Sequence, residues 1–257
     1  NHCRQNKRNA IMKLSLSVES YKGVDGSSLS PTRCSQMVQV YEMLEALGST
    51  VISYVGIQEE ADTKKLFGKT KAKSAIRTFF PLLKKIDFVD YDGDFAANKC
   101  FTELGTQFVL ACRALDNVTE DTPHKEEIIS RLASIKRNAQ IKGLINMYND
   151  PEWKNHNMWI ALKLLKEFRF IHWNEFLYTL HCLETGRTLD DAISDIKKNK
   201  NKIDLIEFVN EDGDVLPNTC YSYLRSYLEE CGLIYKVSSL ESKLSDEADL
   251  FYSHISL

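Results

Sequence analysis

Apolar residues recur every three or four positions along most of the chain, which is the period of a helix with one buried face. Residues 31–47 show this pattern clearly, and Ser30 before them suits a helix N-cap. Pro31 fits a first helical turn, and Gly48 suits a helix end. The predicted buried stripe consists of Met37, Val40, Tyr41, Leu44 and Leu47. The pattern therefore predicts a helix of about four turns.

A second amphipathic helix is predicted within residues 66–86. Its apolar stripe consists of Ala72, Ile76, Phe79, Leu83 and Ile86. Pro81 lies inside it, and because proline removes a backbone donor we expect a kink or a restart there. Before this helix, the β-branched residues 50–57 predict a short strand, and residues 58–67 a short charged helix that ends at Gly68.

Residues 87–105, "DFVDYDGDFAANKCFTELG", follow that helix. They predict a strand, a turn centred on Asp92 and Gly93, a second strand at Lys99–Thr102, and a helix from Glu103. The order from residue 31 onward is helix, strand, helix, helix, strand, turn, strand. This order is that of a winged helix-turn-helix.

A second helical block follows a polar break at residues 116–123. One long helix is predicted from about residue 124, then helices at 157–168, 174–184, 188–199 and 218–230, with a strand at 233–237. We expect a mainly α fold with short β wings, built from tandem winged helix-turn-helix subdomains. The expected division is an N-terminal arm (1–30), subdomain 1 (31–118), a connecting helix (119–150) and a winged-helix-like subdomain 2 (151–257).

Composition places the chain among globular proteins. It has 257 residues, of which 43% are hydrophobic and 27% charged, and a formal net charge of -3. No apolar run is long enough for a membrane span, and the first residues lack the apolar core of a signal peptide. The seven cysteines form no CxxC pair, which favours buried reduced thiols over a disulfide framework or structural zinc. We therefore expect a soluble cytoplasmic protein.

Basic residues are concentrated in residues 61–85, where eight lysines and arginines face one acid, Asp62. A helix face exposed only to solvent usually carries both signs, so this segregation favours contact with nucleic acid over a simple solvated face. We predict that Arg77 and Lys73 contact base edges. The predicted DNA-binding set on this segment is Lys69, Lys71, Lys73, Ser74, Arg77 and Thr78, with Lys69, Lys71 and Ser74 nearer to phosphates.

A second DNA-contacting helix is predicted at 218–230. Its apolar face holds Tyr221, Leu224, Leu228 and Cys231. Its polar face offers Asn218, Thr219, Ser222 and Arg225, which suit hydrogen bonding in a DNA groove but would equally suit any wet surface. Further basic residues at 131–142 and 197–202 could contact the DNA backbone, although solvated charge explains them as well.

Enzymatic motifs are weak throughout the sequence. Glu152 and Lys154 form an E-x-K with Asp150 nearby, but the metal-dependent nuclease pattern needs a buried strand, and Pro151 lies in a polar break. The scattered histidines, His172 and His181 among them, have apolar neighbours and suit structural roles. Neither a dinucleotide-binding nor a phosphate-binding glycine motif is present. We therefore expect no catalytic residue, metal site or cofactor in this chain.

Several segments in order, "AIRTFFPLLKKIDFVDYDGD", "CFTELGTQFV", "NMWIALKLLKEFRFIHWNEFLYTLHCL" and "YSYLRSYLEECGLI", resemble the recognition region of type IIS restriction endonucleases of the FokI and AlwI kind. The resemblance implies that tandem winged helices bind an asymmetric double-stranded DNA site in a bacterial restriction-modification system. It also implies a separate nuclease domain or subunit that uses Mg²⁺, but no segment of this chain matches one. The alternatives are a winged-helix transcription regulator or phage repressor, and a winged-helix scaffold for protein interactions.

Overall fold

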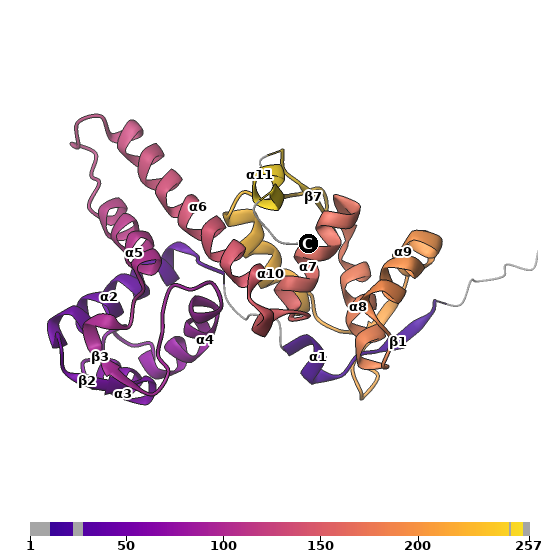
Figure 1. Ribbon diagram of the computed structural model, residues 1–257, viewed down its shortest axis with the longest axis horizontal. Coiled ribbons are helices and arrows are strands. Elements are labelled where there is room, and N and C mark those ends of the chain that lie inside the picture. The colour runs from indigo at the N-terminus through magenta and orange to yellow at the C-terminus, as the bar shows by residue number, and fades with distance from the viewer. Residues whose placement is uncertain (1–10, 23–27, 247, 254–257) are drawn as a thin grey trace, which may run out of the picture.

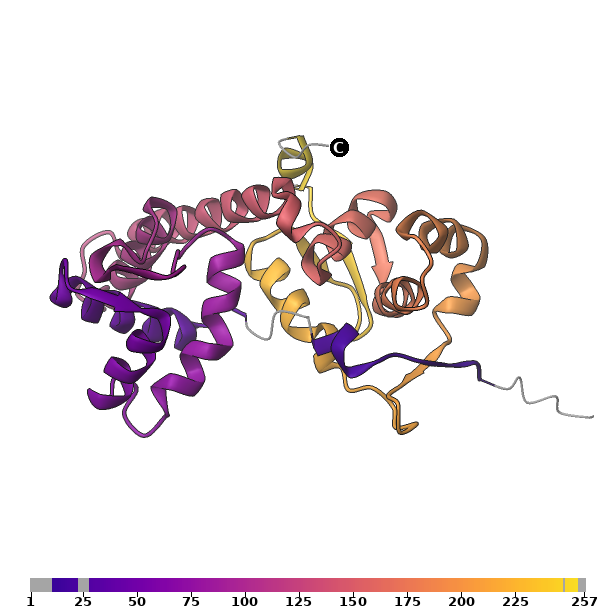
Figure 2. The ribbon, with the colours of Figure 1, turned by 60° about the horizontal axis from the view of Figure 1, so that its bottom comes forward.

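The computed structural model describes residues 11–22, 28–246 and 248–253, and among these it is mainly helical with three small sheets. Figures 1 and 2 show two groups of helices, joined by the long helix α6 (Lys125–Asn149). We call residues 31–116 the first lobe and residues 157–253 the second lobe. Among the described residues, no helix has both the length and the apolar character needed to cross a membrane.

The first lobe packs four α-helices around a small antiparallel sheet. Its elements are α2 (Pro31–Leu47), β2 (Val51–Ser53), α3 (Tyr54–Thr63), α4 (Ala72–Lys85), β3 (Asp94–Ala96), a 3-10 turn (Ala97–Lys99) and α5 (Glu103–Asp116). Ile52 of β2 lies opposite Phe95 of β3, and one further bridge joins Val89 to Phe101. The predicted stripe of α4 is fully buried. In α2, Met37, Val40 and Leu44 are buried and Tyr41 and Leu47 are half-buried, so both amphipathic predictions are confirmed.

Short-range capping decides where these elements begin and end. The Ser30 hydroxyl accepts a hydrogen bond from the Arg33 amide at 3.3 Å, and Gly48 ends α2 with φ +58°, as predicted. The predicted strand over 50–57 is wrong beyond Ser53. The Ser53 hydroxyl accepts from the Gly56 amide at 3.1 Å and starts α3, so residues 54–57 are helical.

Two predictions, at Pro81 and after the turn at 92–93, need correction. α4 continues through Pro81 from Ala72 to Lys85, so the helix does not restart there. The carbonyl group that loses its donor there is that of Arg77, an exposed residue. The strand that follows the turn at 92–93 is β3 at 94–96, which pairs with β2. The predicted second strand at 99–102 is reduced to one bridge, Val89–Phe101, flanked by backbone hydrogen bonds between residues 88–90 and 100–102.

The second lobe contains a three-stranded antiparallel sheet in the order β4-β7-β6. Its elements are α7 (Asn157–Phe168), β4 (Phe170–His172), α8 (Trp173–Glu184), α9 (Leu189–Ile203), β5 (Glu207–Val209), α10 (Thr219–Glu230), β6 (Ile234–Lys236), β7 (Glu241–Leu244) and α11 (Ala248–Ser253). The predicted apolar face of α10 is buried, and its Tyr221 stacks on Trp173 with ring centroids 5.2 Å apart. Gly232 follows α10 with φ +74°.

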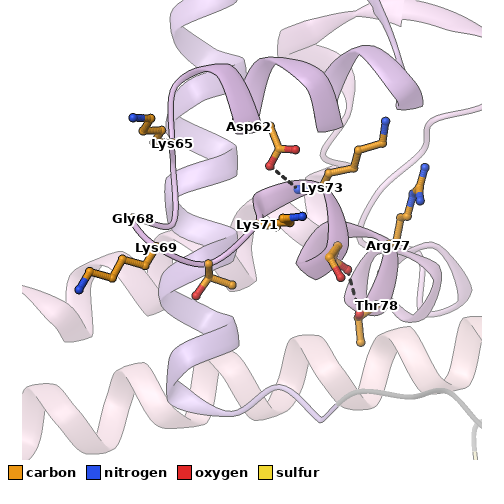
Figure 3. Close-up of a pocket in the computed structure, with 10 residues that line it drawn as sticks. Asp62, Lys65, Gly68, Lys69, Lys71, Lys73, Arg77 and Thr78 are labelled. Carbon is orange, nitrogen blue, oxygen red and sulfur yellow. Dashed lines mark hydrogen bonds between the residues drawn. The ribbon is translucent and has the colours of Figure 1, made fainter.

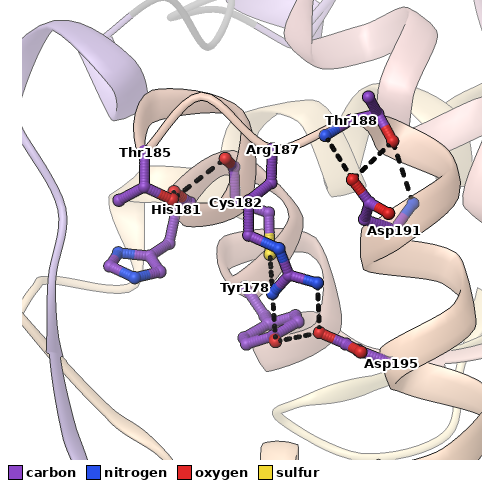
Figure 4. Close-up of polar contacts among 8 residues, drawn as sticks. All are labelled: Tyr178, His181, Cys182, Thr185, Arg187, Thr188, Asp191 and Asp195. Atoms are coloured by element: carbon purple, nitrogen blue, oxygen red, sulfur yellow. Dashed lines mark hydrogen bonds and ion pairs between the residues drawn. The ribbon is translucent and has the colours of Figure 1, made fainter.

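A polar cluster joins α8 to α9 (Figure 4). The Tyr178 hydroxyl donates to the Asp195 carboxylate at 2.7 Å, and the Arg187 guanidinium lies 2.7 Å from the same oxygen. Thr188 and Asp191 form a capping box at the start of α9. These contacts close the turn between the two helices, which gives the cluster a structural role.

The described part of the N-terminal arm packs on the second lobe. β1 (Lys13–Ser15) pairs in parallel with β5, and α1 (Val18–Lys22) follows it. The Ser17 amide donates to the Glu184 carboxylate, and the Ser15 carbonyl lies 2.7 Å from Nδ1 of His181. Residues 1–10 and 23–27 of the predicted arm lie outside the described residues.

The C-terminal half of α6 contacts both lobes. Its buried residues are Ala139, Gln140, Gly143, Leu144, Met147 and Tyr148, whereas its N-terminal half is largely exposed. A Cβ atom on Gly143 would lie 2.5 Å from the carbonyl oxygen of Ile86, so only glycine allows this approach to the first lobe. On the other side, the indole Nε1 of Trp159 donates to the Tyr148 carbonyl at 3.2 Å. The last turns of α6 are therefore held from both sides.

Candidate nucleic-acid interface

The six DNA-binding residues predicted on the first lobe line one open pocket of about 1070 Å³ (Figure 3). We call this the basic pocket. Its lining residues are Asp62, Lys65, Gly68, Lys69, Thr70, Lys71, Lys73, Ser74, Arg77 and Thr78. They come from the end of α3, the loop at 64–71 and the N-terminal half of α4. The fold therefore brings five cations and one carboxylate to one surface.

The loop at 64–71 places three of these lysines. Its backbone turns twice through left-handed conformations, at Lys65 with φ +49° and at Gly68 with φ +63°. The Leu66 amide donates to the Ala61 carbonyl at 3.0 Å, and the side chains of Leu66 and Phe67 pack against the core. Because the apolar side chains of this loop turn inward, Lys65 and Lys69 are left toward solvent.

Asp62 caps α4 from the neighbouring helix. The residue at the N-cap position of α4, Lys71, makes no capping hydrogen bond with its side chain. Instead the Asp62 carboxylate accepts from the Lys73 backbone amide at 2.9 Å. This contact satisfies one of the free amides at the helix N-terminus and fixes α4 relative to α3. It also places a single negative charge among the lysines, where it opposes binding of an anion.

Arg77 has a defined partner inside the first lobe. Its Nε donates to the side-chain oxygen of Gln58 on α3 at 2.9 Å. Lys73 and Arg77 extend on the same side of α4 in Figure 3. Arg77 also lies near Tyr54; burial and the neighbouring Tyr91 raise the pKa of the Tyr54 hydroxyl to about 12, and the charge of Arg77 opposes that shift.

The predicted residues of α10 form a different kind of surface. Asn218 and Thr219 are exposed and Ser222 is half-buried, but the Arg225 side chain is only 11% exposed. The Arg225 guanidinium donates to the Ser239 carbonyl at 2.6 Å and lies 3.2 Å from the Glu229 carboxylate. Arg225 therefore ties α10 to the loop between β6 and β7. The basic pocket and these residues lie on different lobes.

Some residues of the interface were not singled out from the sequence. Gln58 is 2% exposed, and its position on α3 falls one turn from the buried Ala61 and beside the buried Ile57. A lone amide on an apolar helix face is the signal that marks it, because buried polar groups need a partner. For Asp62, no sequence signal indicates that it caps the following helix.

The remaining sequence candidates for catalysis or metal binding take part in contacts that support the fold. Asp150 caps a 3-10 turn (Pro151–Trp153) by accepting from the Glu152 amide at 2.9 Å, and no strand carries the E-x-K. Within the part of the chain that the structure describes, no group of three His, Cys, Asp or Glu residues could hold a metal ion. The six described cysteines are buried and reduced, and Cys3 lies outside the described residues.

Two buried ionisable groups start α8. His172 accepts a hydrogen bond from the Asn174 amide at 3.2 Å through Nδ1, and burial lowers the pKa of this imidazole. The Glu175 carboxylate is fully buried, accepts from the His172 amide and pairs with Lys200, yet burial still raises its pKa. Both groups complete the capping box of α8, so they stabilise the fold of the second lobe.

Comparisons with known protein families, curated proteins and solved structures gave no match. The functional proposal therefore depends on the basic pocket and on the order of the structural elements.

Proposed function

We propose that this chain binds double-stranded DNA in a sequence-specific manner through two winged-helix subdomains. The element order of each lobe supports this proposal. In a winged helix, a helix and a strand precede two helices, and the third helix enters the major groove. α4 holds the third position in the first lobe. In the second lobe α10 holds it, with α9 and β5 inserted before it.

The sheet of the second lobe supports the same proposal. In the second lobe β7 lies between β4 and β6, as expected when the last strand of a wing pairs with both earlier strands. In the first lobe β2 pairs with β3, whereas Val89 pairs with Phe101 and not with β3. The loop at 237–240, which joins the paired strands β6 and β7, would then be the wing of the second lobe. The loop at 90–93 would take the same place in the first lobe.

The basic pocket is the observation that carries the proposal. Lysines and arginines that neutralise phosphates release counterions, which gives the sequence-independent part of DNA affinity. Here they surround the start of α4, whose N-terminal turns would enter the groove first. Arg77 and Lys73 would contact base edges, while Lys69, Lys71 and Ser74 would contact phosphates and Thr78 would border the groove.

As the sequence resemblance implies, we further propose that this chain is the target-recognition part of a bacterial type II restriction endonuclease. Its nuclease would be a separate domain or subunit, which would need Mg²⁺. In this mechanism the chain itself makes and breaks no bond. It fixes the position on the duplex from which the nuclease acts, and two unlike lobes on one chain suit an asymmetric site.

Selection from a pool of randomised duplex DNA tests the proposal. We expect a short asymmetric sequence to be enriched, and the Arg77→Ala variant to lose that enrichment. A palindromic sequence would favour a dimeric transcription regulator. The absence of any enriched sequence would contradict DNA recognition and favour a protein-interaction scaffold.

A further inference from the structure

Among the contacts that the structure describes, Gln58 is the one residue with a buried side-chain amide that contacts a side chain of the basic pocket. Its side chain is 2% exposed, and its oxygen lies 2.9 Å from Nε of the exposed Arg77. α3 and α4 pack directly on each other, so the amide is held by the core and not by solvent. An arginine fixed through Nε has lost rotation about its last side-chain bonds.

The contact leaves the outer end of the guanidinium available. Nε donates to Gln58, whereas within the described residues no acceptor contacts the two terminal nitrogens of Arg77. These nitrogens form a planar fork that can donate two parallel hydrogen bonds. The lysines of the pocket differ, because an ammonium on a flexible chain is a point charge without a preferred plane.

The O6 and N7 atoms of guanine are the pair of major-groove acceptors that fit such a fork. The geometry points to Gln58 as a positioning residue that presents Arg77 end-on to a guanine, and this inference rests on the proposed function. Holding the fork in advance reduces the side-chain entropy lost on binding. Gln58 itself touches no DNA, and its effect passes through Arg77.

Three variants of the selected duplex test the inference, each with another base in place of the guanine that Arg77 contacts. Binding is followed by fluorescence anisotropy with the purified chain. We expect Arg77→Ala to reduce the preference for guanine at that position roughly tenfold or more. Gln58→Met keeps the side-chain volume but removes the acceptor, so it should lower the same preference severalfold. The separate variant Gln58→Glu should retain the preference, because a carboxylate still accepts a hydrogen bond from Nε of Arg77.

Gln36→Met is the matched control. Gln36 is 8% exposed and accepts from the Arg33 guanidinium at 2.7 Å, so its loss breaks a similar pair on α2 that does not line the basic pocket. This variant should leave the base preference unchanged. Circular dichroism and thermal unfolding confirm that each variant keeps its helices.

The outcomes separate the inference from the proposed function. If the wild-type chain binds a selected site and Arg77→Ala loses the guanine preference while folded Gln58→Met keeps it, the positioning role of Gln58 is wrong and DNA recognition stands. A Gln58→Glu variant that folds but does not recover the preference also overturns the positioning role. If the wild-type chain enriches no sequence, the proposed function itself fails.

Discussion

The salt dependence of DNA binding follows directly from the composition of the basic pocket. Five cations line it, namely Lys65, Lys69, Lys71, Lys73 and Arg77. Lys73 and Arg77 are assigned to base edges, which leaves Lys65, Lys69 and Lys71 for phosphates. If each of these three neutralises one phosphate, the logarithm of the binding constant falls with the logarithm of the salt concentration with a slope of about -2.7. Raising salt from about 50 to about 200 mM would then weaken binding roughly 40-fold.

Removing two of these charges should reduce the salt dependence of binding by a defined amount. The Lys69→Ala/Lys71→Ala variant keeps only Lys65 of the cations assigned to phosphates, so its slope should be about -0.9 and the same rise in salt should weaken its binding only roughly 3.5-fold. Anisotropy titrations of a labelled duplex at four or five salt concentrations measure both slopes. These two lysines are exposed, so their loss should leave the unfolding transition unchanged.

A control with the same loss of charge elsewhere makes this result specific. Lys154→Ala/Lys163→Ala removes two lysines near the start of the second lobe, outside the basic pocket. Its slope should equal that of the wild type. An unchanged slope for the Lys69→Ala/Lys71→Ala variant, or an equal reduction in the control, would refute the assignment of phosphate contacts to the basic pocket.

Three further predictions concern stability and are measured by urea unfolding. Arg225→Ala should cost about 1 to 3 kcal/mol, because the Ser239 carbonyl loses its charged donor and the loop at 237–240 is released from α10. Gly105→Ala should cost about 3 kcal/mol or more, since its Cβ would lie 1.9 Å from the Phe88 carbonyl oxygen. His172→Asn should remove a pH dependence of the stability. Burial lowers the pKa of His172 from 6.5, so on acidification the unfolded chain is protonated before the folded chain. The free energy of unfolding of the wild type, relative to that of the variant, should therefore fall as the pH drops below about 6.5.

Local signals explain which parts of the fold could be predicted. α2 carries an N-cap, a first-turn proline, a regular stripe and a final glycine, and all four signals agree. In contrast, residues 54–57 have the composition of a strand, but the Ser53 hydroxyl caps a helix there. Propensity is a weak signal over four residues, so one capping contact together with burial of Ile57 decides the outcome.

The candidate site, like the fold, could be predicted only in part from the sequence. Charge segregation is a property of the sequence, so the lysines around Arg77 could be identified without coordinates. The contacts that organise them could not, because Gln58 and Asp62 reach α4 only through the packing of α3 on α4. Arg225 was predicted as a DNA contact from its helical face alone. Its bond to the loop at 237–240 depends on a strand hairpin that closes after the helix.

The continuous helix α6 also sets how far one lobe is rotated relative to the other about the helix axis. Each residue of an α-helix advances about 1.5 Å and turns about 100°. A single residue inserted between positions 139 and 149, where both lobes hold the helix, would therefore rotate the second lobe about its axis by roughly a quarter of a circle or slightly more. An insertion of the same length in the exposed half at 125–138 could instead be absorbed by the adjoining loop at 117–124. For any duplex that both lobes contact, α6 therefore fixes which faces of the double helix they can reach together.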